Sequence, residues 1–220
     1  MAGLKRIQLS PKRIADEIYS QLLAAIGDGD ITPNQRLVQE RLAAELDVSR
    51  TPVREALLRL EQEGVLERAG KAGFVIRSIT ADEVRDIYQA RQAIEGFSVR
   101  LLTERADSAA LTAIRRTIER EERNVAQTAK AYFNANRSIH RTFVSLAGNA
   151  YLLELFDGIW NRGSSFRMFA AIDDVDLARS LGDHDALADA IATGDADHAA
   201  ASMRAHIVDG LDLQLAAIQP

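Results

Sequence analysis

Residues 46–64, LDVSRTPVREALLRLEQEG, form the stretch that decides the fold of the first third of this chain. Asp47 predicts a tight turn, and Ser49 is placed to cap the helix that follows, with Pro52 tolerated in its first turn. Gly64 predicts the end of that helix, because glycine readily adopts the left-handed conformation found there. The stretch therefore predicts a turn followed by a helix.

The segments on either side complete a recognisable arrangement. Residues 11–26 and 37–46 predict two earlier helices from the helical spacing of their apolar residues. Residues 65–68 and 74–77 read as two short strands of a β-hairpin around the segment 69–73. Three helices followed by a hairpin, with a tight turn before the third helix, are typical of a winged helix-turn-helix. This half of the chain therefore predicts double-stranded DNA as a partner.

The third helix has two faces. Its core face carries apolar residues at helical spacing, namely Val53, Ala56, Leu57 and Leu60. Arg50 and Arg54 lie four residues apart on another face at its N-terminal end, where arginine can read guanine in the major groove. The alternative is a surface helix that these arginines merely keep soluble. Further candidates for contact with DNA are Arg41, Thr51, Lys71 and Gly73.

Composition limits the function classes that remain. Residues 1–78 carry 12 Lys and Arg against 11 Asp and Glu, and residues 79–220 carry 15 against 21. DNA contact must therefore come from a few well-placed arginines rather than from a basic surface. The chain has no cysteine, which excludes disulfides and thiolate metal sites. No apolar run approaches the ~18 residues of a membrane span, so we expect no membrane partner and a cytoplasmic location.

After residue 78 the pattern becomes helical almost throughout, and Thr80 with Glu83 forms a capping box at its start. The expected helices are 80–105, 108–129, 130–147, 150–171, 183–193 and 196–217. The fold class predicted is mainly α. A winged helix-turn-helix DNA-binding domain spans residues 1–78, and an all-α antiparallel helical bundle that senses a ligand spans residues 79–220.

Polar side chains interrupt the apolar stripes of three of these helices. Asn136 and His140 lie four residues apart on one stripe. His184 and His206 lie on two others, at similar distances from the turn at Gly194, so they can face each other. Such groups are costly to bury without partners, and a divalent ion bound by neutral imidazoles would satisfy them together. With nitrogen and neutral oxygen ligands, Zn²⁺, Ni²⁺ and Mn²⁺ are all admissible. A buried hydrogen-bond network without metal is the alternative.

Arg91 is a second anomaly in the predicted bundle. The stripe that contains it runs Val84, Ile87, Arg91, Ile94, Ser98 and Leu101. One interpretation is an ion pair with Glu95 or another carboxylate. The other is a clamp for a carboxylate ligand, because a guanidinium binds a carboxylate through two parallel hydrogen bonds. Arg162, with Trp160, is a further candidate for contact with the effector.

The motifs in both halves resemble one known family. Arg36-Leu37, the run from Val48 to Leu57 and Glu63-Gly64 resemble the GntR family of bacterial regulators. The second half resembles the FCD effector domain of the FadR-like branch, through Asn136-x3-His140, Ala147-Gly148-Asn149, His184-x6-Ile191 and Arg204-x-His206. In the first half, the resemblance implies that Arg50 and Arg54 contact the operator and that the wing glycine, Gly73, lies near DNA.

In the second half, the resemblance implies a metal bound by an aspartate and three histidines, at the positions of Asn136, His140, His184 and His206. Asn136 departs from the usual aspartate and brings no charge, which is expected to weaken the site. Arg91 matches an arginine that lines the ligand cavity, and small organic acids are frequent effectors of the family.

We therefore expect a homodimeric regulator on a palindromic operator, since one recognition helix covers only a half-site. In the family that the chain resembles, repression that a ligand releases is the commoner arrangement, so we expect a repressor released by a small carboxylate effector. A regulator for which the ion itself is the signal is the alternative. A metalloenzyme is disfavoured, because no convincing carboxylate lies on the buried stripes and residues 1–78 would be unexplained.

Overall fold

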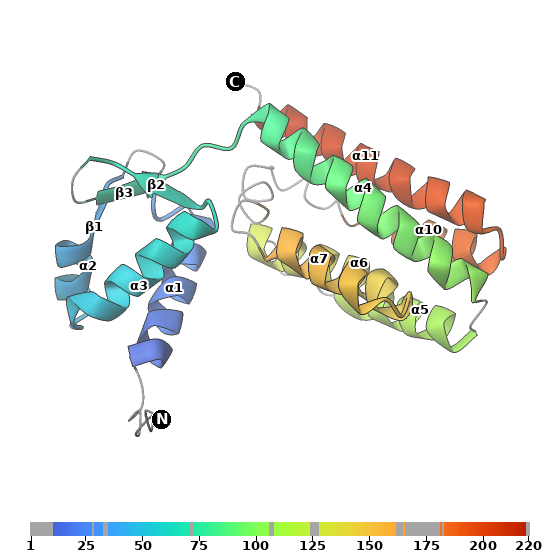
Figure 1. Cartoon of the computed structure of the whole chain (residues 1–220), viewed down its shortest axis with the longest axis horizontal. Coiled ribbons are helices and arrows are strands. Elements are labelled where there is room, and N and C mark those ends of the chain that lie inside the picture. Colours follow the sequence, from blue (N-terminus) through green and yellow to red (C-terminus); the bar gives the residue numbers. More distant parts are fainter. Residues whose placement is uncertain are drawn as a thin grey trace, which may run out of the picture. The chain divides into compact units, whose positions relative to one another are not determined.

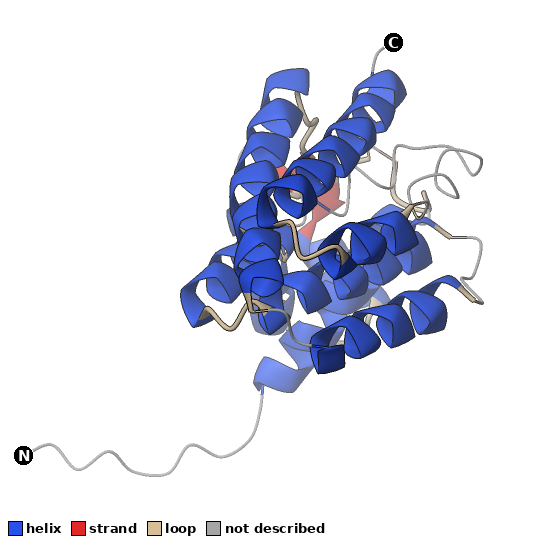
Figure 2. Ribbon diagram, turned by 90° about the vertical axis from the view of Figure 1, so that its right-hand side faces the viewer, coloured by secondary structure: helices blue, strands red, loops and turns tan. Residues whose placement is uncertain are grey.

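The computed structural model describes residues 11–27, 29–32, 35–70, 73–105, 108–123, 128–161, 165, 181 and 183–218. The chain divides into two compact units, residues 1–78 and 79–220. Helices dominate both, and the strands are confined to one small sheet (Figures 1 and 2). Two predicted site residues, Lys71 and Arg162, fall outside the described residues, as does most of the predicted helix beyond residue 161.

The first unit is a winged helix-turn-helix, as predicted. Its elements in chain order are α1 (Pro11–Gly27), β1 (Leu37–Val38), α2 (Gln39–Glu45), α3 (Arg50–Gln62), β2 (Leu66–Arg68) and β3 (Gly73–Ile76). The sheet order is β1-β3-β2, with both pairs antiparallel. Leu37 and Val38 were expected to begin the second helix, and that expectation is wrong. They instead pair with Phe74 and Gly73 of the wing, because the edge of the hairpin satisfies their backbone groups and buries Leu37.

Apolar packing around α3 holds this unit together. Val53, Leu57 and Leu60 are fully buried, and α1 packs against their helix. A polar contact joins the same two helices at the surface, where the Tyr19 hydroxyl donates to Glu63 Oε2 at 2.6 Å. These interactions fix the orientation of α3, whose opposite face is left to solvent.

The ends of α3 follow the sequence signals, with one exception. Asp47 has φ +50° in the preceding turn, and Gly64 has φ +73° just after the helix. Ser49 occupies the N-cap with extended backbone angles, but its side chain makes no capping hydrogen bond. The cap position was therefore predicted correctly, whereas the capping interaction was not.

The second unit is an antiparallel helical bundle. Its described helices are α4 (Ala81–Glu104), α5 (Ser108–Glu122), α6 (Ala129–Leu146), α7 (Ala150–Trp160), α10 (His184–Ala192) and α11 (Ala196–Ile218). The most extensive pairing is that of α4 with α11, which lie side by side in opposite directions (Figure 1). Helix α6 packs against α4, α5 and α7, and α10 packs against α4, α5 and α11. No described helix is long and apolar enough to cross a membrane.

The capping box at the start of α4 is present, with Thr80 Oγ1 accepting from the Glu83 backbone N–H and the Glu83 side chain accepting from that of Thr80. The buried face of α4 is wider than the predicted stripe. It consists of Val84, Tyr88, Arg91, Glu95, Gly96, Ser98, Val99, Leu102 and Thr103. Ile87, Ile94 and Leu101 are only half-buried. The face is wider because α4 packs against α11 as well as against α6 and α7.

Candidate metal centre and DNA-contacting surface

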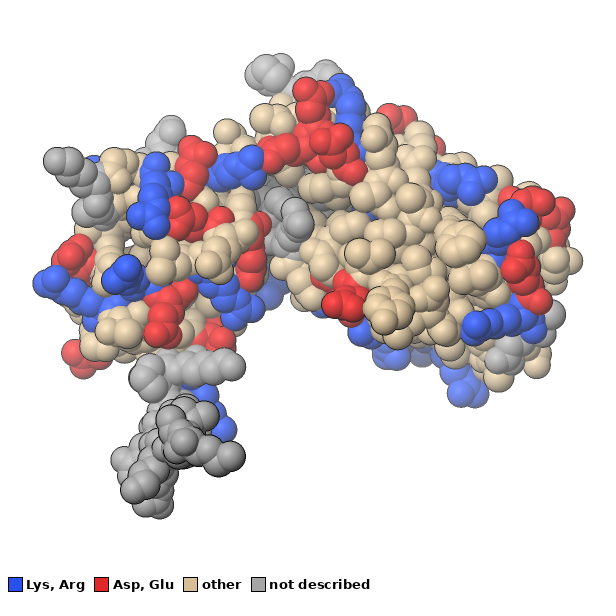
Figure 3. All heavy atoms as spheres, viewed as in Figure 1, with Lys and Arg blue, Asp and Glu red and all other residues tan. Residues whose placement is uncertain are grey.

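The predicted DNA-contacting residues of α3 and α2 lie on the surface of the first unit. Arg50 and Thr51 are exposed at the N-terminal end of α3, and Arg54 is exposed one turn later. Arg50 Nη1 lies 3.4 Å from Glu40 Oε1, whereas Arg54 makes no ion pair with any described residue. Basic and acidic side chains are intermixed on the face of this unit in view (Figure 3). Of the two arginines of this pair, Arg54 is therefore the one whose guanidinium has no described carboxylate partner.

Arg41, the remaining candidate on α2, is also exposed and pairs with Glu45 at 2.9 Å. The two helices of the helix-turn-helix are tied together by Gln39, whose Nε2 donates to the Arg50 carbonyl at 3.0 Å. A hollow of about 280 Å³ lies between these helices and the wing, and Arg54 and Arg68 both line it.

Gly73 has a packing role rather than an exposed one. It is buried, and a Cβ at this position would collide with the side chain of Arg36. That Gly73 lies near DNA stays a prediction. Arg36 is itself exposed where it crosses the wing, and it was missed as a candidate contact. The sequence motif includes Arg36, but Leu37 and Val38, which follow it and pair with the wing as β1, were expected to begin a helix.

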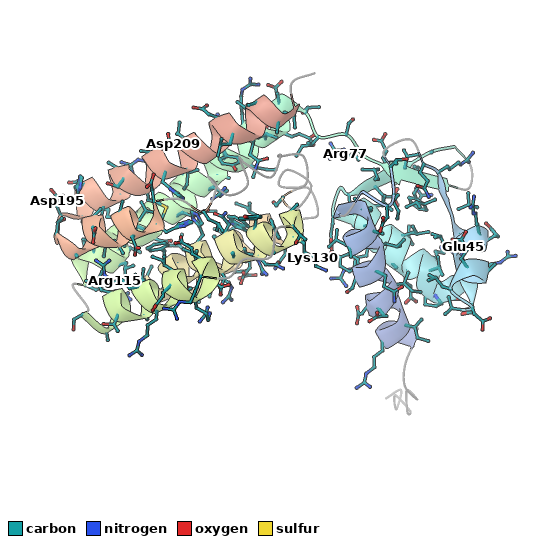
Figure 4. The ribbon with its side chains drawn as sticks, turned by 180° about the vertical axis from the view of Figure 1, so that it is seen from behind. Glu45, Arg77, Arg115, Lys130, Asp195 and Asp209 are labelled. Carbon is teal, nitrogen blue, oxygen red and sulfur yellow. The ribbon has the colours of Figure 1, made fainter. Side chains whose placement is uncertain are left out.

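The three histidines predicted to face inward converge in the second unit. His140 lies on α6, His184 begins α10 and His206 lies midway along α11. Nε2 of His140 is 3.3 Å from Nε2 of His184 and 3.3 Å from Nε2 of His206. One ring nitrogen from each residue lies within 4.8 Å of the other two. We call this group the histidine cluster. Side chains fill the space between the helices of this unit (Figure 4).

The hydrogen bonds made by the Nδ1 atoms determine the protonation state of the Nε2 atoms, which face the centre of the cluster. His140 Nδ1 lies 2.5 Å from Glu95 Oε2, and His184 Nδ1 lies 2.9 Å from Glu122 Oε1 and 3.0 Å from the Leu181 carbonyl. All these partners are acceptors, so each Nδ1 carries the proton and each Nε2 presents a lone pair. Two such lone pairs 3.3 Å apart cannot hydrogen-bond to each other. A proton on His206 Nε2 could satisfy His140, but it would leave His184 Nε2 without a donor.

A metal ion fits this donor set. Two nitrogens that each lie ~2.0–2.1 Å from one ion, at the tetrahedral angle, are about 3.4 Å apart. The two Nε2–Nε2 distances of 3.3 Å match that separation. Carboxylates and carbonyls behind ligating histidines are also the usual outer partners of such sites, because they fix the tautomer and raise the basicity of the ligand.

Burial favours the neutral forms of His140 and His206. Burial lowers the pKa of His140 from 6.5 to about 4, although Glu95 acts in the opposite direction. Burial, together with the neighbouring histidines, lowers the pKa of His206 to about 2. Both imidazoles are therefore neutral near pH 7, as metal ligation requires.

The other two polar candidates differ in position. Asn136 is buried on α6, one helical turn before His140 and on the same face, as predicted. His198 is exposed on α11, which agrees with its interpretation as a surface residue. Of the four histidines in the chain, only His198 lies apart from the cluster.

Arg91 makes the ion pair that was one of its two interpretations. Its Nε lies 2.9 Å from Glu95 Oε1, and the two side chains are 6% and 1% exposed. The guanidinium also lies over the rings of Tyr88 and Trp160, 4.8 and 4.5 Å from their centroids. Trp160 is buried and stacks on His140, with ring centroids 5.8 Å apart. Arg91 and the histidine cluster are thus parts of one buried polar network.

Sequence reasoning missed Glu122 and considered Glu95 only as an ion-pair partner of Arg91, not as a partner of a histidine. The statement that no convincing carboxylate lies on the buried stripes is wrong, because Glu95 is buried and contacts His140. Burial alone would raise the pKa of Glu95, but Arg91 and His140 lower it to about 2, so this carboxylate stays ionised. Its position four residues after Arg91 was the available signal for the ion pair. Nothing local in the sequence indicated its contact with His140, 45 residues away.

Comparisons with known proteins agree with both halves of this description. Residues 14–76 match the bacterial regulatory proteins of the gntR family, and residues 86–209 match the FCD domain. The Nta operon transcriptional regulator of Aminobacter aminovorans is 31% identical over 180 residues, which cover 82% of this chain and 84% of that protein.

Solved structures share the fold. A GntR regulator from Rhodococcus sp. RHA1 has a TM-score of 0.67 at 23% identity, covering 94% of this chain and 100% of that chain. A structure described as the metal-free FCD domain of a transcriptional regulator has a TM-score of 0.52 at 18% identity, covering 64% of this chain and 97% of that one. The histidine cluster lies within the region that matches the FCD domain. This chain belongs to the GntR family: it is a DNA-binding transcription regulator with an FCD domain, and not an enzyme.

Proposed function

We propose that this regulator binds one divalent metal ion through His140, His184 and His206, with the Asn136 amide oxygen as a neutral fourth ligand. The observation that carries the proposal is the pair of unprotonated Nε2 atoms held 3.3 Å apart by acceptors behind each ring. Zn²⁺, Ni²⁺ and Mn²⁺ all suit nitrogen and neutral oxygen donors. When bound, the ion would offer a Lewis-acidic position to a carboxylate.

Elemental analysis of full-length protein, purified without chelator or metal-affinity resin, tests this proposal. We expect close to one equivalent of metal per chain, or one equivalent on adding Zn²⁺, Ni²⁺ or Mn²⁺. At a free metal concentration of 100 Kd, the bound ion should stabilise the FCD unit by about 2.7 kcal/mol. His184→Ala should abolish binding, and the exposed His198→Ala should not. Less than a tenth of an equivalent after metal addition would leave only the hydrogen-bond network.

We further propose that the effector is a small carboxylate held by Arg91. The guanidinium is permanently charged and buried beside the histidine cluster, so an anion there would meet a desolvated positive group. Binding of the acid would release the operator and relieve repression. Arg91→Gln keeps the side-chain length and removes the charge. Operator binding of this variant should be normal without effector and should not respond to it. A normal response would contradict the assignment.

The operator is proposed to be palindromic and its reader a homodimer, because one α3 helix covers a single half-site. An exposed apolar surface on α4 and α7 supports self-association. Phe97, Tyr151 and Leu155 are 50%, 79% and 56% exposed, and the two helices pack against each other. Few charges interrupt the face over these helices (Figure 3). Light scattering should give a dimer mass, and Leu155→Glu should reduce it. A monomer with full operator affinity would contradict the proposal.

A second candidate function is metal sensing, with the ion itself as the signal. It is favoured by the existing pair between Arg91 and Glu95, which already supplies the arginine with a carboxylate. The two functions are separated by measuring operator affinity while titrating metal with and without candidate acids. An acid-dependent shift supports the carboxylate effector, and a shift with metal alone supports the sensor. Either function would operate in the cytoplasm, where the operator DNA lies.

A further inference from the structure

One buried carboxylate touches both halves of the proposed ligand site. Glu95 Oε1 accepts from Arg91 Nε at 2.9 Å and from Trp160 Nε1 at 3.4 Å. Glu95 Oε2 accepts from His140 Nδ1 at 2.5 Å. The two oxygens thus point to two different partners, one the proposed anion-binding arginine and the other a proposed metal ligand.

This arrangement is shielded from solvent. The side chains of Glu95, His140 and Arg91 are 1%, 0% and 6% exposed. Charges in such an environment act on one another far more strongly than charges in water. A change in charge at Arg91 must therefore be felt at His140, and Glu95 contacts both residues.

We infer that Glu95 is a positioning residue that couples metal binding at the histidine cluster to carboxylate binding at Arg91. The inference rests on the proposed metal and effector sites. An anion at Arg91 shares the guanidinium with Glu95, which leaves more of the Glu95 charge for His140. His140 then becomes the stronger ligand. The two ligands therefore bind with positive coupling.

A second carboxylate beside the histidine cluster, that of Glu122, is a natural control for this role. Glu122 stands behind His184 as Glu95 stands behind His140, with Oε1 2.9 Å from Nδ1. Glu122 is 32% exposed, and the Leu181 carbonyl shares the same Nδ1. Neither it nor His184 has a described contact with Arg91. Glu122 therefore supports a ligand without joining the two sites.

The test is a pair of titrations on chelator-stripped, full-length protein. Zn²⁺ is titrated with and without acetate, and acetate is titrated with and without Zn²⁺. Wild type should bind Zn²⁺ more tightly with acetate, by a factor of about 5–150, and linkage requires the same factor for acetate with Zn²⁺. Glu95→Gln should lose about 10–100-fold in Zn²⁺ affinity and should lose the coupling. Glu122→Gln should lose less affinity and keep the coupling.

Arg91→Gln is the second variant, in case Glu95→Gln does not fold. It removes the guanidinium that shares the Glu95 charge, so by the same mechanism Zn²⁺ should bind more tightly than to wild type without acetate, and acetate should no longer change the Zn²⁺ affinity. Circular dichroism establishes that each variant is folded.

Coupling that persists in Glu95→Gln or Arg91→Gln would show that acetate acts on the ion directly and would overturn the inference. Loss of coupling in Glu122→Gln would also overturn it. If wild type binds Zn²⁺ but acetate has no effect, the inference fails and the metal site stands. If wild type binds no Zn²⁺, the metal site fails first.

Discussion

The two units of this regulator differ in where their polar and charged side chains lie: the second unit buries several of them, and the first buries none of those described. Every buried polar or charged residue described belongs to the second unit, and the set consists of Arg91, Glu95, Ser98, Thr103, Thr117, Asn136, His140, Ser165, His184 and Gln214. The core of the first unit is apolar, from Ile18 to Ile76. Its arginines and carboxylates stay at the surface, where they form exposed pairs such as that of Arg41 with Glu45.

The difference follows from what each unit recognises. DNA is larger than the protein domain and is contacted at the surface, so the first unit needs only a rigid scaffold that presents α3. A small ion or acid must be surrounded, and the ligands proposed for them accordingly lie inside the bundle. Burying those ligands costs stability unless each has a partner. The carboxylates behind His140 and His184 provide such partners. Outward-pointing charges such as Arg115, Asp195 and Asp209 remain on the surface of the same unit (Figure 4).

The largest expected effect is acid destabilisation confined to the second unit. In the metal-free protein, His140 and His206 have pKa values of about 4 and about 2, against an ordinary value of 6.5. At a pH between the lowered pKa of each histidine and 6.5, the unfolded chain binds more protons than the folded protein does. The free energy of unfolding is therefore at its full value above pH 6.5 and falls as the pH decreases. At pH 5 the two histidines together should remove about 3–4 kcal/mol from the free energy of unfolding.

Urea unfolding at pH 7 and pH 5 measures this loss, with the fluorescence of Trp160, the single tryptophan, reporting the second unit. His206→Gln should show a smaller pH dependence than wild type, and His198→Gln should match wild type. Equal acid sensitivity in an isolated fragment of residues 1–78 would remove the contrast between the units.

The second largest effect is expected at the DNA-contacting surface of the first unit. Arg54→Ala and Arg50→Ala should each cost about 1–3 kcal/mol in binding to the specific operator. The loss should be greater for Arg54, because Arg50 must first leave Glu40, 3.4 Å away. Fluorescence anisotropy with operator and scrambled duplexes at one salt concentration tests both variants. Equal losses on the two duplexes would mean that these arginines contact only phosphates.

The next effect is a smaller one, a gain in metal affinity, and it is expected in the helical bundle of the second unit. Asn136→Asp places a charge on the same buried face as His140 and should tighten metal binding about tenfold, or ~1.4 kcal/mol. Without metal, the same charge should lower stability, because burial disfavours an ionised carboxylate. Competition with a chromophoric chelator measures the first effect, and thermal unfolding of the stripped protein measures the second. Unchanged metal affinity would place residue 136 outside the coordination sphere.

The smallest effect compares one helix cap from each unit. Thr80→Ala removes a capping box and should cost about 1 kcal/mol in the unfolding of the second unit. Ser49→Ala removes no capping hydrogen bond and should cost at most a few tenths of a kcal/mol. Thermal unfolding of the two variants tests both values. A large loss in Ser49→Ala would indicate a capping interaction that the free protein does not show.

Much of the architecture could be predicted from local sequence signals. Thr80 and Glu83 marked the start of α4, and Asp47 and Gly64 marked the turns around α3, because capping and positive φ depend on neighbours in the chain. Leu37 and Val38 were misassigned because their partner strand lies more than thirty residues away. Local propensity does not report such pairing.

Helical periodicity alone identified the residues proposed as metal ligands. Asn136, His140, His184 and His206 each interrupt an apolar stripe, and helical periodicity is enough to turn them inward. Their hydrogen-bond partners, in contrast, depend on how the helices pack against one another. Glu95 and Glu122 reach the histidines from α4 and α5, across separations of 45 and 62 residues. Periodicity assigns a side chain to a face of its own helix, whereas the packing of that helix against others decides which groups meet there.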